Sequence, residues 1–242
     1  MASLSPRAPE LRRPWLMQQD WQHLTFVHWA IDPAMVADMM PRGVRPDTLD
    51  GATYVGLIPF RMHDAGPGRG PGVPYLGTFA ETNVRLYSVD DHGRHGVVFR
   101  SLETTRLAVV LGARGLFGTP YMWARMSIDI KGDVITYSTR RRLPGPRGVG
   151  GTMRVRVGAP IDEPSPLEVF LTARFGLHTS WLSRPLWIPN AHPPWSLRQA
   201  TLEHLDDGLV AAAGLPGITD RTPDSVVHSV GLRTEFGFPR RV

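Results

Sequence analysis

Cysteine is absent from the 242 residues of this chain, and lysine occurs once, as Lys131. The absence of cysteine excludes disulfides, thiol catalysis and metal sites built on cysteine ligands. Lys131 precedes Gly132 and Asp133, a turn signal between two alternating segments, so we expect it at an exposed hairpin tip. An amine in that position is a poor Schiff-base former at neutral pH.

Long apolar runs are also absent. No stretch approaches the ~20 consecutive apolar residues of a transmembrane helix, and residues 1–13 lack the apolar core of a signal peptide. We therefore expect a cytoplasmic protein without a membrane partner. Hydrophobic residues still make up 42% of the chain, which is ample material for a core.

Acidic residues are outnumbered by basic ones, which gives a formal net charge of +5 and a pI of about 10.2. The run 140–142, with Arg147, Arg154 and Arg156, could form a basic strip for nucleic acid. A genomic preference for arginine over lysine is the competing explanation, because all but one of the 27 basic residues are arginine. No recognised nucleic-acid-binding motif accompanies the charge, so we expect no such partner.

Metal and phosphate motifs are lacking as well. His92 and His95 lie on a turn without a matching carboxylate, and we interpret them as solvated side chains. The glycine-rich run 66–72 has neither a Gly-Lys-Ser/Thr ending nor a following helix, so it is not a phosphate loop. We expect no metal and no cofactor. The surrounding loop, 63–78, has the length typical of a lid over a cavity or of a mobile surface segment.

Residues 1–14 are rich in proline and arginine and are expected to form a disordered lead-in. A single domain should then occupy residues 15–242, and no internal repeat divides it.

Alternating apolar and polar residues predict about ten short strands in this domain. They are expected at 21–29, 44–49, 53–60, 79–89, 96–102, 121–130, 134–140, 152–158, 177–181, 186–188 and 225–236. Hairpins are expected between 44–49 and 53–60, where Asp50-Gly51 is the turn signal, between 79–89 and 96–102, and between 121–130 and 134–140. Four helices are expected at 32–41, at 104–118 with a cap at Thr104 or Thr105, at 165–176 with a capping box, and at 202–214. This pattern favours one mainly antiparallel, barrel-like α+β domain.

The second predicted helix leads directly into a strand. Gly115 or Gly118 can end the helix in the left-handed conformation, and Pro120 prevents it from resuming. From Tyr121 the pattern alternates with a period of two, so Tyr121 and Arg125 share one strand face. That face mixes aromatic and ionisable groups, which suits either a solvated sheet surface or the wall of a ligand cavity.

A second polar group lies on the strand predicted at 79–89. Glu81, Asn83 and Arg85 alternate with other residues and project to the same side. On a solvated face they would be ordinary surface groups. On a cavity wall, Glu81 and Arg85 would have to pair with each other or with a polar ligand, because an unpaired buried charge is costly.

The residues around the helix end resemble the active-site segment of acetoacetate decarboxylase and its relatives. In those enzymes an arginine, a helix end and a proline lead into two adjacent lysines, and Arg114 and Pro120 have the matching spacing. Residues 21–60 and 79–85 also resemble the wider acetoacetate-decarboxylase-like superfamily, most of all a bacterial branch known only as a domain of unknown function.

The resemblance implies a β-barrel or cone with a central cavity and helices packed outside. It also implies that Glu81 matches a cavity glutamate of the decarboxylases. Tyr121 and Met122 occupy the positions of the two lysines, and neither side chain has the amine that a Schiff base requires. We therefore do not expect a Schiff-base decarboxylase.

Site roles follow as hypotheses. Glu81 and Tyr121 are the candidate catalytic pair, with the Tyr121 phenol donating a hydrogen bond to a carbonyl or enolate. The candidate substrate-binding residues are Asn83, Arg85, Arg114 and Arg125. Arg114 is either a carboxylate anchor or a cation favoured at a helix C-terminus.

Two function classes stay open at this point. In the first, the protein is a non-covalent acid/base enzyme of lyase, isomerase or cyclase type that acts on a carbonyl or carboxylate compound. In the second, it is a binding protein that kept the cavity and lost catalysis. Either way the expected partner is a small molecule, and a homo-oligomer is left open.

Overall fold

The computed structural model describes residues 4–242. The strands are β1 (Trp15–Ile31), β2 (Val44–Pro46), β3 (Thr53–Pro67), β4 (Phe79–Asp90), β5 (His95–Thr104), β6 (Tyr121–Lys131), β7 (Val134–Leu143), β8 (Gly150–Pro160), β9 (Gly176–Trp181), β10 (Arg184–Ala191), β11 (Leu197–Asp207), β12 (Ser225–Gly237) and β13 (Arg240–Arg241). The helices are α1 (Leu107–Phe117), α2 (Pro166–Thr172) and α3 (Leu209–Ala212), with 3₁₀ turns at Pro33–Met35, Ala37–Met39 and Ile218–Asp220.

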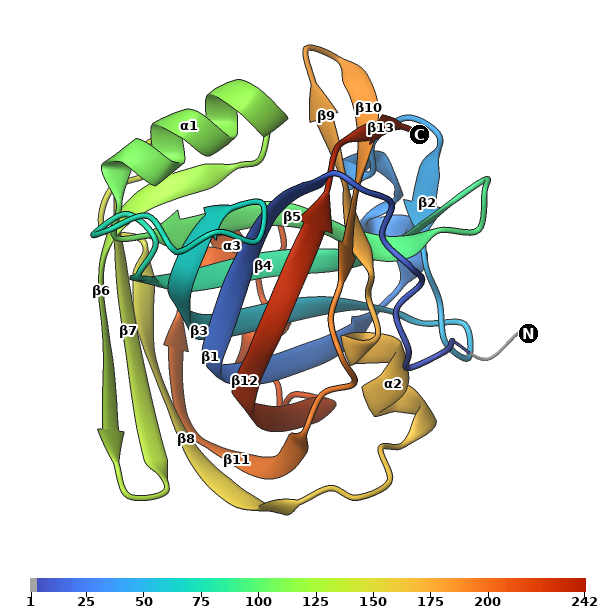
Figure 1. The fold of residues 1–242 in the computed structure, drawn as a ribbon. Helices are drawn as coiled ribbons and strands as arrows, with labels where there is room; N and C mark the ends of the chain where they lie inside the picture. The colour runs from blue at the N-terminus through green and yellow to red at the C-terminus, as the bar shows by residue number, and fades with distance from the viewer. Residues whose placement is uncertain (1–3) are drawn as a thin grey trace.

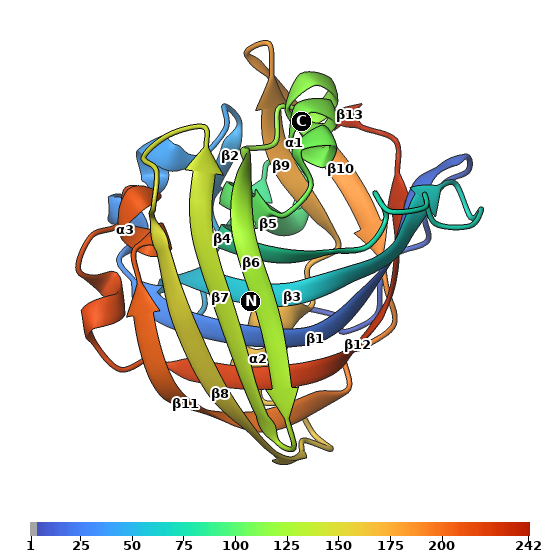
Figure 2. The same cartoon turned by 90° about the vertical axis from the view of Figure 1, so that its left-hand side faces the viewer.

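The sheet closes on itself as a ring (Figures 1 and 2). From β4 the hydrogen-bonded path runs through β5, β6, β7, β8, β11, β12, β1 and β3 and returns to β4. A second path leaves β5 for β9 and β10 and rejoins the ring at β12. Only the pairs β5–β6 and β5–β9 are parallel among the pairings of the described residues. The mainly antiparallel α+β class predicted from the sequence is confirmed.

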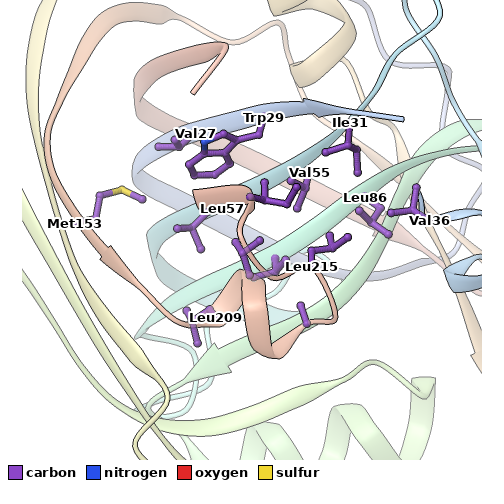
Figure 3. Packing of buried hydrophobic residues seen from close by; sticks show 14 of the residues in the cluster. Val27, Trp29, Ile31, Val36, Val55, Leu57, Leu86, Met153, Leu209 and Leu215 are labelled. Carbon is purple, nitrogen blue, oxygen red and sulfur yellow. The ribbon is translucent and has the colours of Figure 1, made fainter. Parts of the chain in front are cut away.

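The interior of the ring holds one apolar cluster (Figure 3). Trp29 comes from β1, Leu57 from β3, Leu86 from β4, Met153 from β8 and Leu209 from α3. Each such side chain stabilises the fold by about 1.5 to 3 kcal/mol when it is fully removed from water. The short helix α3 therefore contributes to this core.

Strand β4 is buried on both faces. Val84 and Leu86 point into the ring core, while Tyr87, on the alternate face, packs in a different apolar cluster together with Phe170 of α2. A third cluster, which includes Phe26 and Phe60, adjoins this outer face. Side chains at odd positions of β4 are therefore covered rather than solvated, and this decides where the functional groups of the strand lie.

Helix α1 ends as predicted but begins differently. Gly118 has a φ of 65° and its N–H donates to the Arg114 carbonyl, which is the left-handed C-cap expected for glycine. The cap predicted at Thr104 or Thr105 is wrong, because the N-cap is Arg106 and no side chain caps the helix. Thr104 is the last residue of β5 and pairs with β4 and β6.

The helix predicted at 202–214 is largely wrong. Residues up to Asp207 belong to β11, which pairs with β8, and the register shifts between Leu202 and His204. This bulge adds one residue to the strand, so that Leu202 and Leu205, three apart, both pack against the ring core. Their spacing imitates a helical stripe, and only Leu209–Ala212 is helical.

The hairpin predicted between 44–49 and 53–60 is also wrong. Asp50 and Gly51 do form a turn, closed by a bridge between Leu49 and Ala52, but β2 pairs with β4 and β3 pairs with β1 and β4. The helix predicted at 32–41 consists of two 3₁₀ turns. In contrast, the capping box of α2 and the hairpins β4–β5 and β6–β7 are confirmed.

The segment predicted to be disordered, 1–14, lies partly outside the described residues, which begin at residue 4. Residues 4–14 contain no helix or strand, and Leu4 packs against the apolar cluster of α2 and β10. Within residues 4–242, no helix combines the length and the apolarity required to cross a membrane.

Candidate functional site

A cavity of about 440 Å³ lies beside the outer face of β4, bordered by α1 and by several strands. Aromatic side chains from well-separated parts of the chain form much of its wall, namely Trp21, Phe60, Phe79, Phe99, Phe117 and Phe236. Val73 and Leu76, from the loop between β3 and β4, also border it; the loop expected at 63–78 begins only after Pro67, where β3 ends. The cavity is therefore mainly apolar, with a few polar groups at defined places, as is usual for small-molecule sites.

Two polar groups meet in this cavity from different elements. Glu81 projects from β4 and is only 3% exposed. Tyr121 is the first residue of β6, placed there by the glycine C-cap of α1 and the turn through Pro120. The Tyr121 hydroxyl donates a hydrogen bond to Glu81 Oε2 at 3.0 Å. The alternation of β4 and the helix-to-strand junction thus place an acid and a phenol in contact.

Burial controls the ionisation of this pair. The pKa of Glu81 is raised to about 8. Desolvation by burial is the main cause, and the negative charge of the nearby Glu103 carboxylate contributes in the same direction. Hydrogen bonds from Tyr121 and Asn83 oppose the shift and are weaker than the desolvation. Burial together with the Glu81 charge raises the pKa of Tyr121 well above its usual range. At neutral pH, Glu81 is therefore mainly a neutral carboxylic acid and Tyr121 a neutral phenol.

Asn83 and Arg85 follow on the same face of β4 and line the same cavity. Asn83 is 4% exposed, and its Oδ1 atom has no hydrogen-bond partner among the described residues. A buried acceptor left without a donor is costly, on the order of 1 to 3 kcal/mol. The Asn83 amide is therefore suited to receive a hydrogen bond from a bound molecule.

Arg85 is held in place by a network on its far side. Its Nε and Nη2 atoms donate to the Tyr87 hydroxyl at 3.1 and 2.9 Å, and Nη2 also donates to the Leu171 carbonyl at 2.9 Å. The Tyr87 hydroxyl in turn lies 2.6 Å from Nε2 of His28. The guanidinium is therefore held in place by neutral groups.

The charge of Arg85 is not balanced by any carboxylate in the described part of the chain. The side chain is 9% exposed, and no carboxylate of residues 4–242 lies within ion-pairing distance of it. The neighbouring buried guanidinium, Arg174, is by contrast paired with Asp47. Because Glu81 is mainly neutral at pH 7, the cavity carries a net positive charge that would favour an anionic ligand.

The other two predicted binding residues do not line the cavity. Arg114 is exposed and its Nη1 atom donates to the Tyr121 carbonyl at 3.0 Å, at the C-terminal end of α1. Arg125 is exposed and borders a different pocket. It shares a strand face with Tyr121, as the sequence indicates, but α1 packs against β6 only near its start. The same face is therefore covered at Tyr121 and open at Arg125.

The residues that hold Arg85 in place, Tyr87 and His28, were not predicted from the sequence. Tyr87 lies two residues after Arg85 on the same strand face, so the period of two could have identified it. His28 is fully buried in β1. Its contact with Tyr87 brings together strands distant in the sequence and had no local signal.

No group of three or more metal-ligating side chains occurs in the described part of the chain. His95 instead contacts Asp47 through Nδ1 at 2.8 Å. Lys131 lies at the β6–β7 turn, as predicted, with 81% of its side chain exposed and with Asp129 as its ion-pair partner. The sole lysine is therefore far along β6 from the cavity end of that strand.

The fold defines the class. The chain is similar to an acetoacetate-decarboxylase-like enzyme from Sphingomonas wittichii RW1, with a TM-score of 0.66, 13% identity and coverage of 95% of this chain and 94% of the other. It is also similar to the acetoacetate decarboxylase of Legionella pneumophila (TM-score 0.63, 13% identity, 97% and 91% coverage). A third similar structure is the enduracididine biosynthesis enzyme MppR complexed with pyruvate (TM-score 0.62, 16% identity, 95% and 91% coverage). The protein thus has the fold of the acetoacetate-decarboxylase-like superfamily.

Within that class, residues 18–233 match the family DUF2071, described as an uncharacterized conserved protein. The chain belongs to this family. It is 30% identical over 228 residues to the uncharacterized protein YqjF of Bacillus subtilis (strain 168), covering 94% of this chain and 92% of that protein. The branch of unknown function that the sequence resembled is therefore confirmed.

Proposed function

We propose that the protein binds a small carbonyl or carboxylate compound in the 440 Å³ cavity and acts on it as a non-covalent acid/base enzyme. The observation that carries this proposal is the contact between the buried, mainly neutral Glu81 and the Tyr121 hydroxyl at 3.0 Å, in a cavity that also contains the unpaired Arg85. A carboxylic acid with a pKa of about 8 can exchange a proton with a ligand near neutral pH.

The roles follow from the chemistry of each group. Arg85 presents guanidinium N–H groups to a carboxylate of the ligand, while Asn83 Oδ1 accepts a hydrogen bond from it. Glu81 exchanges a proton with a carbon next to the carbonyl group or with the carbonyl oxygen. Tyr121 donates its single O–H to Glu81 in the free protein, and in the complex this donor turns to negative charge that develops on the ligand. The apolar wall excludes water and accommodates the rest of the molecule.

The alternative is a binding protein that has the same cavity and no catalysis. What favours it is our interpretation that Tyr121 and Met122 occupy the positions of the two decarboxylase lysines, since neither side chain has an amine. Binding would still use Arg85 and Asn83, and the two functions differ in what Glu81 and Tyr121 contribute.

Proton exchange distinguishes the two functions. MppR has been obtained with pyruvate, so pyruvate and longer 2-oxo acids in deuterated buffer are suitable probes. We expect this protein to accelerate the exchange of protons next to the carbonyl group, observed as loss of the ¹H NMR signal. The Tyr121→Phe variant should lose on the order of a hundredfold in rate, by analogy with the loss of an oxyanion donor.

Matched controls are available in the same chain. Tyr75 is 75% exposed and does not line the cavity, so Tyr75→Phe should keep the full exchange rate. If a 2-oxo acid binds without any exchange, and Tyr121→Phe changes only its affinity by roughly 0.5 to 1.5 kcal/mol, the protein is a binding protein and the enzymatic proposal is wrong.

Borohydride treatment tests the absence of Schiff-base chemistry. With acetoacetate or pyruvate present, the mass of the protein is expected to stay unchanged, because a Schiff base needs an amine at the cavity and Lys131 is exposed at a hairpin tip. Mass spectrometry of the intact and digested protein is the measurement. A reduced adduct on Lys131 would refute both this expectation and the non-covalent mechanism.

A further inference from the structure

A second pocket, of about 380 Å³, lies on the outer face of β6, β7 and β8, the strands nearest the viewer in Figure 2. Its polar lining includes Arg125, Ser127, Ser138, Arg140, Thr152 and Asp206. None of its lining residues borders the cavity of Glu81 and Tyr121. Whatever binds here would therefore do so independently of the function proposed above.

The feature that needs an explanation is a pair of like charges. Arg125 of β6 and Arg140 of β7 are direct partners in the antiparallel register, on the same face of the sheet. Two cations placed opposite each other on neighbouring strands destabilise a sheet. Neither guanidinium forms an ion pair or donates a side-chain hydrogen bond anywhere within the described residues 4–242.

Other arginines on the same face of the sheet have acidic partners. On β8, Arg154 and Arg156 both pair with Glu203, at 3.2 and 2.7 Å, and Arg156 also pairs with Asp133 at 2.9 Å. The sheet therefore supplies acids next to arginines two strands away from Arg125. Around Arg125 and Arg140 no acid of residues 4–242 lies within ion-pairing distance, although Asp206 also lines the pocket, so two positive charges remain there without a paired acid.

The rest of the pocket supplies hydrogen-bonding groups and space. The hydroxyls of Ser138 and Thr152 lie 3.4 Å apart on adjacent strands, and Ser127 is the direct register partner of Ser138. Gly148, Gly150 and Gly151 contribute lining without side chains, and Met126 and Thr139 also border the pocket. Two guanidinium groups and a row of hydroxyls match the oxygens of a tetrahedral oxyanion.

We propose that this pocket binds the phosphoryl group of a small phosphorylated molecule between Arg125 and Arg140, with the hydroxyls of Ser127, Ser138 and Thr152 as further donors. The bound anion offsets the repulsion between the two arginines. The pocket opens to solvent because both arginines are exposed, so the remainder of the molecule extends outward. Asp206, at the border of the pocket, can accept a hydrogen bond from a hydroxyl or ammonium group in the rest of the bound molecule.

Thermal unfolding with inorganic phosphate as the probe tests this site. At equal ionic strength, phosphate should raise the melting temperature of the wild type by about 2 to 4 °C more than chloride, and the effect should saturate. Titration calorimetry should show one phosphate bound, about tenfold or more weakly in Arg125→Gln and in Arg140→Gln. Without phosphate and at low salt, Arg140→Gln should melt at a higher temperature than the wild type, because the like-charge repulsion is gone.

Arg184→Gln is the matched control. Arg184 is exposed at the start of β10 and does not line this pocket, so its loss removes the same charge and should leave phosphate binding unchanged. The proposal is overturned if phosphate stabilises no more than chloride, or if Arg184→Gln weakens binding as much as Arg140→Gln. It is also overturned if a single-stranded oligonucleotide binds through Arg125 and Arg140 while phosphate does not, since the surface would then serve nucleic acid.

Discussion

Replacing Glu81 by glutamine is expected to make the protein more stable at alkaline pH. The pKa of Glu81 is raised from 4.5 to about 8 in the folded protein, so between these values the unfolded chain loses a proton that the folded protein retains. Stability must then fall as pH rises through this window. Glutamine removes the penalty, and its advantage over the wild type should grow by about 3 to 4 kcal/mol between pH 5 and pH 8.5.

Urea unfolding of both proteins across this pH range is the measurement. The glutamine amide in the Glu81→Gln variant can still accept the hydrogen bond from Tyr121, so the comparison isolates the titration of the carboxyl group. Glu163→Gln, at an exposed position, removes the same charge and should show no such pH-dependent gain. A constant difference between Glu81→Gln and the wild type from pH 5 to pH 8.5 would mean that Glu81 titrates normally, and the acid role proposed for it would lose its basis.

Replacing Glu103 by leucine should destabilise the protein by about 3 to 5 kcal/mol. Arg141 Nε donates to Glu103 Oε1 at 2.9 Å, and the two side chains are 3% and 0% exposed. Ser101 donates a further hydrogen bond to Glu103 Oε2 at 3.2 Å. Without the carboxylate, the Arg141 charge stays buried between β5 and β7 with no counter-ion, which is why the cost is large.

Denaturant unfolding at neutral pH measures this cost, and Glu203→Leu is the matched control. Glu203 also pairs with arginines, but these pairs lie at the surface, where an ion pair contributes only about 0 to 1 kcal/mol. Combining Glu103→Leu with Arg141→Leu should recover much of the lost stability, because no charge is then left unpaired. Equal costs for Glu103→Leu and Glu203→Leu would contradict the buried-pair interpretation.

The sequence predicts the site to a different extent for each residue. The period of two in β4 correctly places Glu81, Asn83 and Arg85 on one face, and it cannot say whether that face is covered. The covering elements come from distant parts of the chain, among them α1 and β10. Tyr121 and Arg125 share a face in the same way, yet only Tyr121 lies beneath α1. Local alternation therefore identifies the candidates, and the long-range packing selects among them.

Most β-hairpins could also be anticipated, since their signals lie within a few residues of the turn. The predictions are wrong where strand pairing or side-chain packing joins residues that lie far apart in the sequence. Because of the bulge in β11, Leu202 and Leu205 have the spacing of a helical stripe. Strand β2 pairs with β4 and not with β3, which follows it in the sequence.

By itself, the sequence determined the chemical limits of this protein. It excluded thiol chemistry, supplied a single lysine, Lys131, and set the alternation that aligns the polar groups of β4. Only the tertiary structure decided which of these groups are buried together. It raised the pKa of Glu81 through desolvation, kept Arg85 beyond ion-pairing distance of every carboxylate in residues 4–242, and placed Arg125 opposite Arg140 on the neighbouring strand. The physical reason is that burial and charge compensation depend on segments far apart in the chain, which no local pattern records.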